Sequence, residues 1–113
     1  MNVTMNQVEA VMDLFQSLQT KYEYRGELEN IVQQKWNMRA VMQQMPSRED
    51  MTQLVKFFML YSDDRSFKEF FYHYNEYYDS MLRVRNDRLH RRWLQQQTLQ
   101  KKDQKEEETN VEP

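Results

Sequence analysis

Arginine is concentrated in one short stretch of the chain, from Arg83 to Trp93. These eleven residues contain five arginines and one acidic residue, Asp87. The guanidinium group is planar and donates two parallel hydrogen bonds, so it suits phosphate and carboxylate oxygens. An arginine-rich helix is one way to bind an RNA groove or a DNA backbone. The candidates for such contacts are Arg83, Arg85, Arg88, Arg91 and Arg92.

Apolar side chains interleave with these arginines. Leu82, Leu89 and Trp93 are separated by seven and four residues, a spacing that suits a short coiled coil with another chain. Tryptophan is also over-represented among the residues that anchor protein interfaces. The sequence therefore predicts a protein-binding surface as well, with the apolar residues as anchors and arginines as charged selectors. The predicted contact residues are Leu82, Leu89, Trp93, Arg85, Arg88 and Arg92.

The net charge of −2 conceals a strong segregation of charge along the chain. Residues 83–102 hold seven basic side chains and one acidic, whereas residues 103–113 hold one basic and five acidic. Residues 63–82 hold two basic and five acidic side chains. Domains that bind phosphate usually carry a net positive charge, so the acidic neighbours favour a protein partner or a second copy of the chain. Nucleic-acid binding, which salt would weaken steeply, and a structural subunit of a larger assembly are the alternatives.

Few residues offer catalytic or metal chemistry. His73 has Glu69 and Glu76 one helical turn away on either side, but no third or fourth ligand follows at a recognisable spacing. Asp63 and Asp64 are typical of a loop and a helix start. A single glycine excludes a glycine-rich phosphate loop. We therefore expect a small adaptor or regulatory protein that is not an enzyme and has no cofactor, metal or small-molecule substrate.

The composition predicts an all-α fold, a small bundle of about four helices. The 113 residues suffice for one small domain and include one glycine, two prolines and no cysteine, too few turn residues for many hairpins. No apolar run approaches the roughly 20 residues of a membrane span, and the first residues lack a cationic start followed by an apolar core. We expect an intracellular protein, cytoplasmic or nuclear, without a transmembrane segment.

The first two predicted helices span about residues 5–24 and 27–45. Thr4 and Gln7 have the spacing of a capping box that starts the first helix, and Gly26 is predicted to take the left-handed conformation at its end. The spacing leaves open whether these two helices are separate or continuous. The apolar positions of the second are Leu28, Ile31, Val32, Met38, Val41, Met42 and Met45.

Two further helices are predicted after Pro46. Ser47 caps the third helix, which continues to Tyr61. Ser66 and Glu69 form a second predicted capping box and open the fourth helix. The helical pattern then continues to about Gln100, which gives roughly 35 residues and about 50 Å.

The face of the fourth helix that is aromatic from Phe67 to Met81 becomes cationic from Arg85 to Arg92, by a count of about 100° per residue. Such a change is expected where a helix leaves its own domain. We therefore predict a helical body (1–82), a projecting basic extension (83–100) and a disordered charged tail (101–113). Most of the aromatic face should be core, with Tyr72 and Tyr77 the candidates for exposure.

Overall fold

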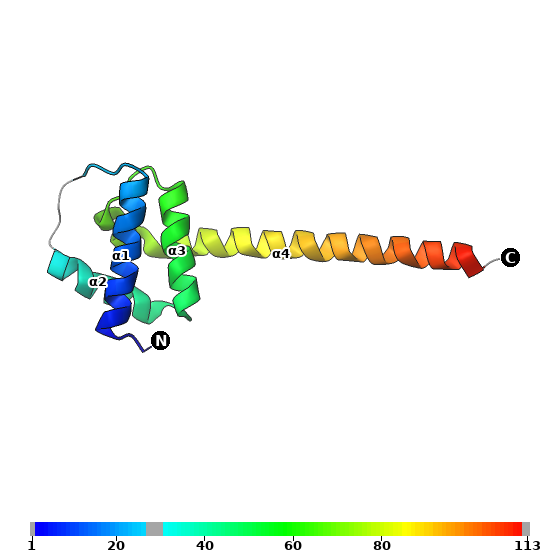
Figure 1. Ribbon diagram of the computed structural model, residues 1–113, viewed down its shortest axis with the longest axis horizontal. Coiled ribbons are helices and arrows are strands. Elements are labelled where there is room, and N and C mark those ends of the chain that lie inside the picture. The colour runs from blue at the N-terminus through cyan, green and yellow to red at the C-terminus, as the bar shows by residue number, and fades with distance from the viewer. Residues whose placement is uncertain (1, 27–30, 112–113) are drawn as a thin grey trace. The chain divides into compact units, whose positions relative to one another are not determined.

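The computed structural model describes the backbone of residues 2–26 and 31–111, and the side chains of residues 2–26 and 31–97. Within these ranges it contains four α-helices and no strand: α1 (Met5–Lys21), α2 (Ile31–Gln44), α3 (Arg48–Tyr61) and α4 (Phe67–Val111) (Figure 1). The predicted all-α fold with a long C-terminal helix is confirmed.

The chain divides into two compact units, Met1–Asp79 and Ser80–Pro113. The first contains α1, α2, α3 and the start of α4, and the second the remainder of α4. The helix continues to Val111 rather than ending near Gln100. The side chains of the predicted tail, residues 101–113, lie outside the described residues, so its disorder stays a prediction.

The start of α1 is the capping box that the sequence predicts. The Thr4 hydroxyl accepts a hydrogen bond from the Gln7 amide at 3.3 Å, and the Gln7 side chain accepts one from the Thr4 amide at 3.0 Å. Each bond pairs a backbone N–H that has no partner within the helix. These contacts fix the first turn of α1.

The end of α1 differs from the prediction. The amide of Tyr24 donates to the carbonyl of Gln19 at 2.9 Å and that of Glu23 donates to the carbonyl of Thr20 at 3.1 Å, the two bonds of a Schellman motif. The left-handed residue of this motif is Glu23, with φ 58°, and not Gly26, whose φ is not positive. The prediction for Gly26 is wrong because the helix ends a turn earlier than its apolar pattern indicated.

Helix α2 buries Met38, Val41 and Met42 against the core. Residues 27–30, where the second helix was predicted to begin, lie outside the described residues. Ile31 and Val32 were predicted to face the core but are 53 % and 66 % exposed. Ile31 is the first residue of α2, and Val32 lies about 120° around the helix from the buried set.

Helix α3 begins and ends as the sequence predicts. The Ser47 hydroxyl accepts a hydrogen bond from the Asp50 amide at 3.1 Å, which caps the helix. The carboxylate of Asp50 accepts a second bond, of 2.7 Å, from the hydroxyl of Tyr78 on α4. One residue at the start of α3 therefore joins this helix to α4.

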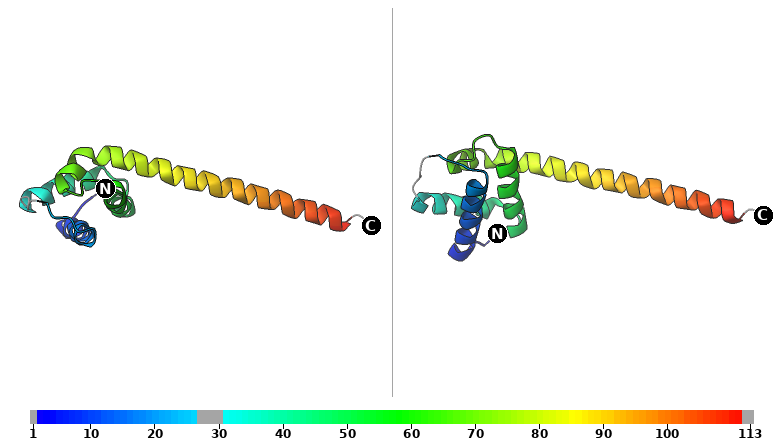
Figure 2. Two further views of the ribbon diagram at one scale, coloured as in Figure 1. Left: turned by 90° about the horizontal axis from the view of Figure 1, so that it is seen from above. Right: turned by 45° about the horizontal axis from the view of Figure 1, so that its top comes forward.

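The core of the first unit is a cluster of phenylalanines around Phe15 of α1. Its ring centroid lies 5.9 Å from that of Phe58, 5.5 Å from that of Phe67 and 5.3 Å from that of Phe70. These distances fall in the range of favourable aromatic pairs. Helices α1 and α3 lie side by side and α2 crosses α1, as Figures 1 and 2 show. A single side chain thus joins α1, α3 and α4.

Candidate protein-interaction surface

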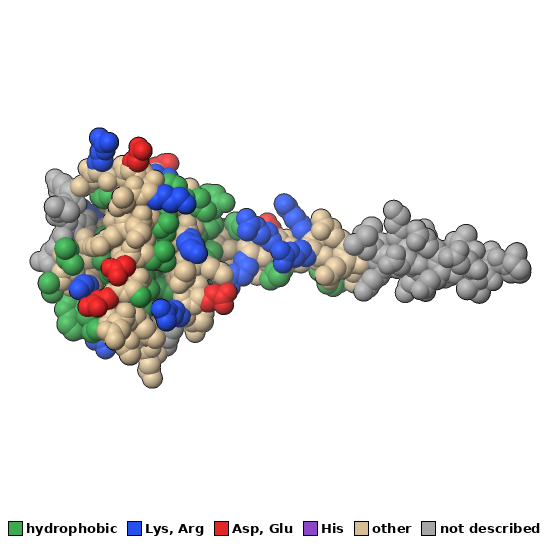
Figure 3. Space-filling model, viewed as in Figure 1, with side chains coloured by type: hydrophobic (Ala, Val, Ile, Leu, Met, Phe, Trp, Pro, Cys, Tyr) green, Lys and Arg blue, Asp and Glu red, His purple; other side chains and the backbone are tan. Residues whose placement is uncertain are grey.

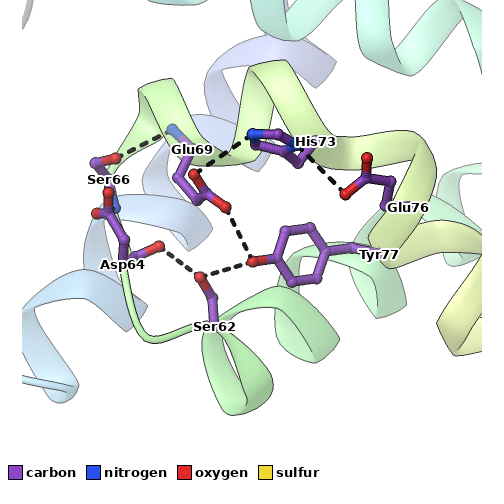
Figure 4. A network of polar contacts seen from close by, with 7 residues as sticks. All are labelled: Ser62, Asp64, Ser66, Glu69, His73, Glu76 and Tyr77. Atoms are coloured by element: carbon purple, nitrogen blue, oxygen red, sulfur yellow. Dashed lines mark hydrogen bonds and ion pairs between the residues drawn. The ribbon is translucent and has the colours of Figure 1, made fainter.

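A group of polar side chains secures the turn between α3 and α4 (Figure 4). The Ser62 hydroxyl donates to the carbonyl of Asp64 at 2.5 Å, and the Tyr77 hydroxyl donates to Ser62 Oγ at 3.0 Å. Oε1 of Glu69 lies 3.3 Å from the same Tyr77 oxygen. A phenol has one proton, so Tyr77 donates to Ser62 or to Glu69 at any moment.

The predicted capping box at the start of α4 forms only in part. Ser66 Oγ accepts from the Glu69 amide at 3.1 Å as expected, but the Ser66 amide donates to the carboxylate of Asp64 at 3.0 Å instead of to Glu69. Asp64 is closer to Ser66 in the chain than Glu69 is, and its carboxylate accepts the hydrogen bond in place of Glu69. The Glu69 carboxylate is left to face Tyr77 and His73.

The histidine of this polar group lies between two glutamates. Nδ1 of His73 lies 3.3 Å from Glu76 and Nε2 lies 3.8 Å from Glu69. Among the residues that the structure describes, no group of three or more His, Asp or Glu side chains is arranged to hold a metal ion. Burial raises the pKa of the Tyr77 hydroxyl, and the charge of Glu69 raises it further, against the opposing hydrogen bond with Ser62. Tyr77 therefore stays protonated and serves as a structural tie.

The arginine-rich segment belongs to the second unit, where its side chains are open to solvent. Arg83, Arg88, Arg91 and Arg92 are exposed, and Arg85 is half-buried. Figure 3 shows these basic side chains gathered along this stretch of α4, with apolar surface between them. The guanidinium groups are thus placed where an anionic partner can reach them.

The apolar anchors lie beside the arginines on the same helix. Leu89 and Trp93 are 55 % and 51 % exposed, whereas Leu82 is half-buried. Counted at about 100° per residue, these three residues fall within an arc of about 40°. Arg85, Arg88 and Arg92 occupy a second arc of about 60°, centred about 90° away. Arg83 and Arg91 lie outside both arcs.

Local contacts order part of this apolar stripe. The imidazole of His90 stacks on the indole of Trp93, with centroids 6.0 Å apart and 23° between the planes. Half of the tryptophan surface stays open to solvent even so. A helix with an exposed apolar stripe bordered by arginines can lie in an apolar groove whose rim carries carboxylates.

The structure also contains a groove that sequence reasoning missed. A hollow of about 210 Å³ opens between α2 and the start of α4. Its α4 wall consists of aromatic rings and its α2 wall of side-chain amides, and among the lining residues that the structure describes Lys68 is the one that is charged. The lining residues are Gln33, Gln34, Asn37, Phe67, Lys68, Phe71 and Tyr72. Tyr72, predicted as a candidate for exposure, is 69 % exposed, whereas Tyr77 is half-buried in the polar network.

A helical count along α2 indicates an exposed aromatic side chain, but one that lies outside the lining of this groove. Trp36 has no place among the apolar positions that point to the core, and it is 54 % exposed. The pairing of α2 with the start of α4 has no signal in the sequence, because it depends on the packing of helices far apart in the chain.

No family model, curated protein or solved structure matches this chain. None of the helix segments that the structure describes combines the length and the apolar character needed to cross a membrane.

Proposed function

We propose that this chain is a small helical adaptor or regulatory protein, without catalytic activity, that binds another protein chain through residues 82–93 of α4. The partner is a different protein or a second copy. The observation that carries this proposal is the joint exposure of Leu89 and Trp93 on one side of the helix, about half of each side chain being open to solvent. Exposed tryptophan and leucine are costly to leave in water unless a partner covers them.

The charges beside the stripe support a partner with an acidic rim. Arg85, Arg88 and Arg92 lie along one edge of the apolar arc, where each can pair with a carboxylate as the stripe is covered. Such pairs mainly govern specificity and the rate of association, whereas the buried anchors supply most of the affinity. This division assigns affinity to Leu89 and Trp93, and selection of the partner to the arginines.

Nucleic-acid binding is the second candidate, and the same three arginines favour it. Their arc of about 60° would follow a phosphate backbone, and arginine forms bidentate contacts with phosphate. The apolar stripe has no role in such a complex unless its tryptophan stacks on a base. The proposal of a protein partner accounts for both the arginines and the stripe, and we prefer it for that reason.

Fluorescence anisotropy with labelled RNA and duplex DNA, at low and near-physiological salt, separates the two candidates. The adaptor proposal predicts no tight binding, or binding that is weak and unaffected by Leu89→Ser with Trp93→Ser. Micromolar binding that collapses with salt, and that disappears in the variant Arg85→Glu, Arg88→Glu, Arg92→Glu, would favour nucleic acid instead.

A truncation after Leu82 tests the location of the contact. The adaptor proposal predicts that the remaining chain keeps a cooperative unfolding transition but no longer binds the partner. Loss of cooperative unfolding would contradict the predicted division between a folded body and a binding extension.

A further inference from the structure

The groove between α2 and the start of α4 is of a size that accepts side chains. Pockets that bind small organic ligands usually measure about 300–1,000 Å³, and this one measures about 210 Å³. It therefore suits one or two amino-acid side chains of a bound segment better than a complete metabolite. All of its lining residues belong to the first unit of the chain.

One wall of the groove is a row of aromatic rings that leads from the core to the surface. Phe67 is 4 % exposed and stacks on Phe71 with centroids 6.3 Å apart. Phe71 in turn meets the ring of Tyr72 at 5.9 Å, edge to face. The inner rings are held in place by the core, so the exposed ring of Tyr72 packs against side chains whose position is fixed. Rigid aromatic surface of this kind is enriched at protein interfaces.

The opposite wall carries amides in an ordered arrangement. Nε2 of Gln33 donates a hydrogen bond to Oδ1 of Asn37 at 3.0 Å. A side-chain amide offers both a donor and an acceptor, as a peptide group does. Amides opposite aromatic rings can therefore contact the backbone of an extended segment while the rings contact its apolar side chains.

The charge of the groove indicates the sign of the charge that a bound partner would carry. Lys68 is charged, and none of the described residues in the lining carries a carboxylate. Helix α2 contains two cations, Lys35 and Arg39, and no acidic residue. Lys35 is offset by Glu9 at 3.6 Å, but the guanidinium of Arg39 lies over the exposed ring of Trp36, 5.7 Å from its centroid. By a count of about 100° per residue, Lys35 and Arg39 lie on the other side of α2 from Gln33, Gln34 and Asn37, so the positive charge at the groove comes from Lys68.

We propose that this groove binds a short acidic peptide segment of another protein. An aliphatic or aromatic side chain of the segment packs against Phe71 and Tyr72, its backbone faces Gln33 and Asn37, and a carboxylate lies beside Lys68. A peptide fits better than RNA because residues 1–79 hold eight basic and twelve acidic side chains. This net negative charge repels a continuous phosphate backbone, whereas one carboxylate needs only its nearest cation.

This site is separate from residues 82–93, and its existence does not depend on the function proposed for them. Together the two surfaces would allow one chain to join two proteins.

The test is selection of peptides from a random display library on the full-length chain. Peptides retained by the variant Lys68→Glu, Tyr72→Ser are removed first, which discards those that bind the arginines of α4. The matched control is Lys56→Glu, Tyr61→Ser, because α3 offers a lysine and an exposed tyrosine that do not line the groove. Thermal unfolding shows that each variant is folded.

The proposal predicts enriched peptides with an apolar residue next to Asp or Glu. Their affinity should fall about tenfold or more in the groove variant and stay unchanged in the control. A peptide in which lysine replaces the acidic residue should bind the single variant Lys68→Glu, because the two charges are exchanged. This charge exchange keeps the test valid if the double variant fails to fold. No enrichment, enrichment of basic peptides, or equal binding to groove variant and control would overturn the proposal. Selective retention of random-sequence RNA by the wild-type groove would overturn it as well.

Discussion

The hydroxyl of Tyr77 lies 3.0 Å from Oγ of Ser62, although fifteen positions separate them in the chain. Ser62 caps the end of α3 and is 4 % exposed, while Tyr77 comes from the third turn of α4. The contact fixes the turn between the two helices, and with it the position of the first turns of α4. The aromatic wall of the groove begins in those turns.

Replacement of Tyr77 by phenylalanine should lower the free energy of unfolding by about 0.5–1.5 kcal/mol. The ring keeps its edge-to-face contact with Phe58, at 4.9 Å, so the loss reports the hydroxyl alone. Chemical denaturation measures it. Tyr72→Phe is the control, because the exposed ring should give a change within about 0.5 kcal/mol. Equal effects of the two variants would contradict a structural role for the Tyr77 hydroxyl.

Alkaline pH should also reveal this contact. Burial, with the charge of Glu69, raises the pKa of folded Tyr77 above the ordinary value of 10.0. In the unfolded chain the phenol then loses its proton at lower pH than in the folded chain. Its contribution to stability is therefore complete below about pH 10 and is lost as the pH rises through the folded pKa. Denaturation midpoints at increasing pH should fall more steeply for wild type than for Tyr77→Phe. Parallel slopes would contradict the raised pKa.

Glycine in place of Glu23 should stabilise the first unit. A left-handed residue other than glycine costs about 1–2 kcal/mol. Glycine removes this strain, but it has more conformational freedom to lose on folding, so only part of the cost is recovered. We expect a gain of about 0.5–1 kcal/mol, measured by thermal unfolding. Glu23→Ala, which removes the carboxylate but keeps the strain, should give no gain. A loss of stability with glycine would show that the carboxylate matters more than the backbone conformation.

Phe15→Ala should be the most damaging single change in the first unit. It removes a ring that three phenylalanines of α3 and α4 contact, and such truncations cost about 3–5 kcal/mol. A small domain has about 5–15 kcal/mol in total, so cooperative unfolding should be weakened or lost. Circular dichroism during heating measures this. A midpoint within a few degrees of wild type would show that the core is organised around another residue.

Local signals in the sequence were the most reliable. The caps formed by Thr4 and by Ser47 are present with the predicted partners, because a helix cap depends on residues three positions apart. The boundary at Pro46 is correct for the same reason, since proline restricts its immediate neighbour.

Sequence signals predicted the structure less reliably where the outcome depends on tertiary packing, or on competition between side chains for the same hydrogen-bond partner. Gly26 had the right type for a left-handed residue, but the helix end is set by where α1 stops packing, and Glu23 takes the conformation. Glu69 had the right spacing for a capping box, but Asp64 competes for the same amide. The groove was not foreseen because it joins α2 to a distant part of the chain. Leu89 and Trp93 could be placed on one side of the fourth helix from the sequence, because one helix carries them at helical spacing, whereas their role as anchors stays a prediction.

The stability of the two anchor variants separates binding from folding. Leu89→Ser and Trp93→Ser together should change the denaturation midpoint very little, since exposed positions outside a core usually contribute within about 0.5 kcal/mol each. Equilibrium unfolding measures this. A large loss of stability would show that the two side chains are part of the folded core rather than a free surface.

Capture of partners from native extract is the most direct test of the central claim. The full-length chain and the variant Leu89→Ser, Trp93→Ser are compared after nuclease treatment, with quantification of bound proteins by mass spectrometry. The account predicts at least one protein, or the chain itself, that wild type retains and the variant loses. Equal retention by both chains, or retention that nuclease abolishes, would contradict a protein-binding role for residues 82–93.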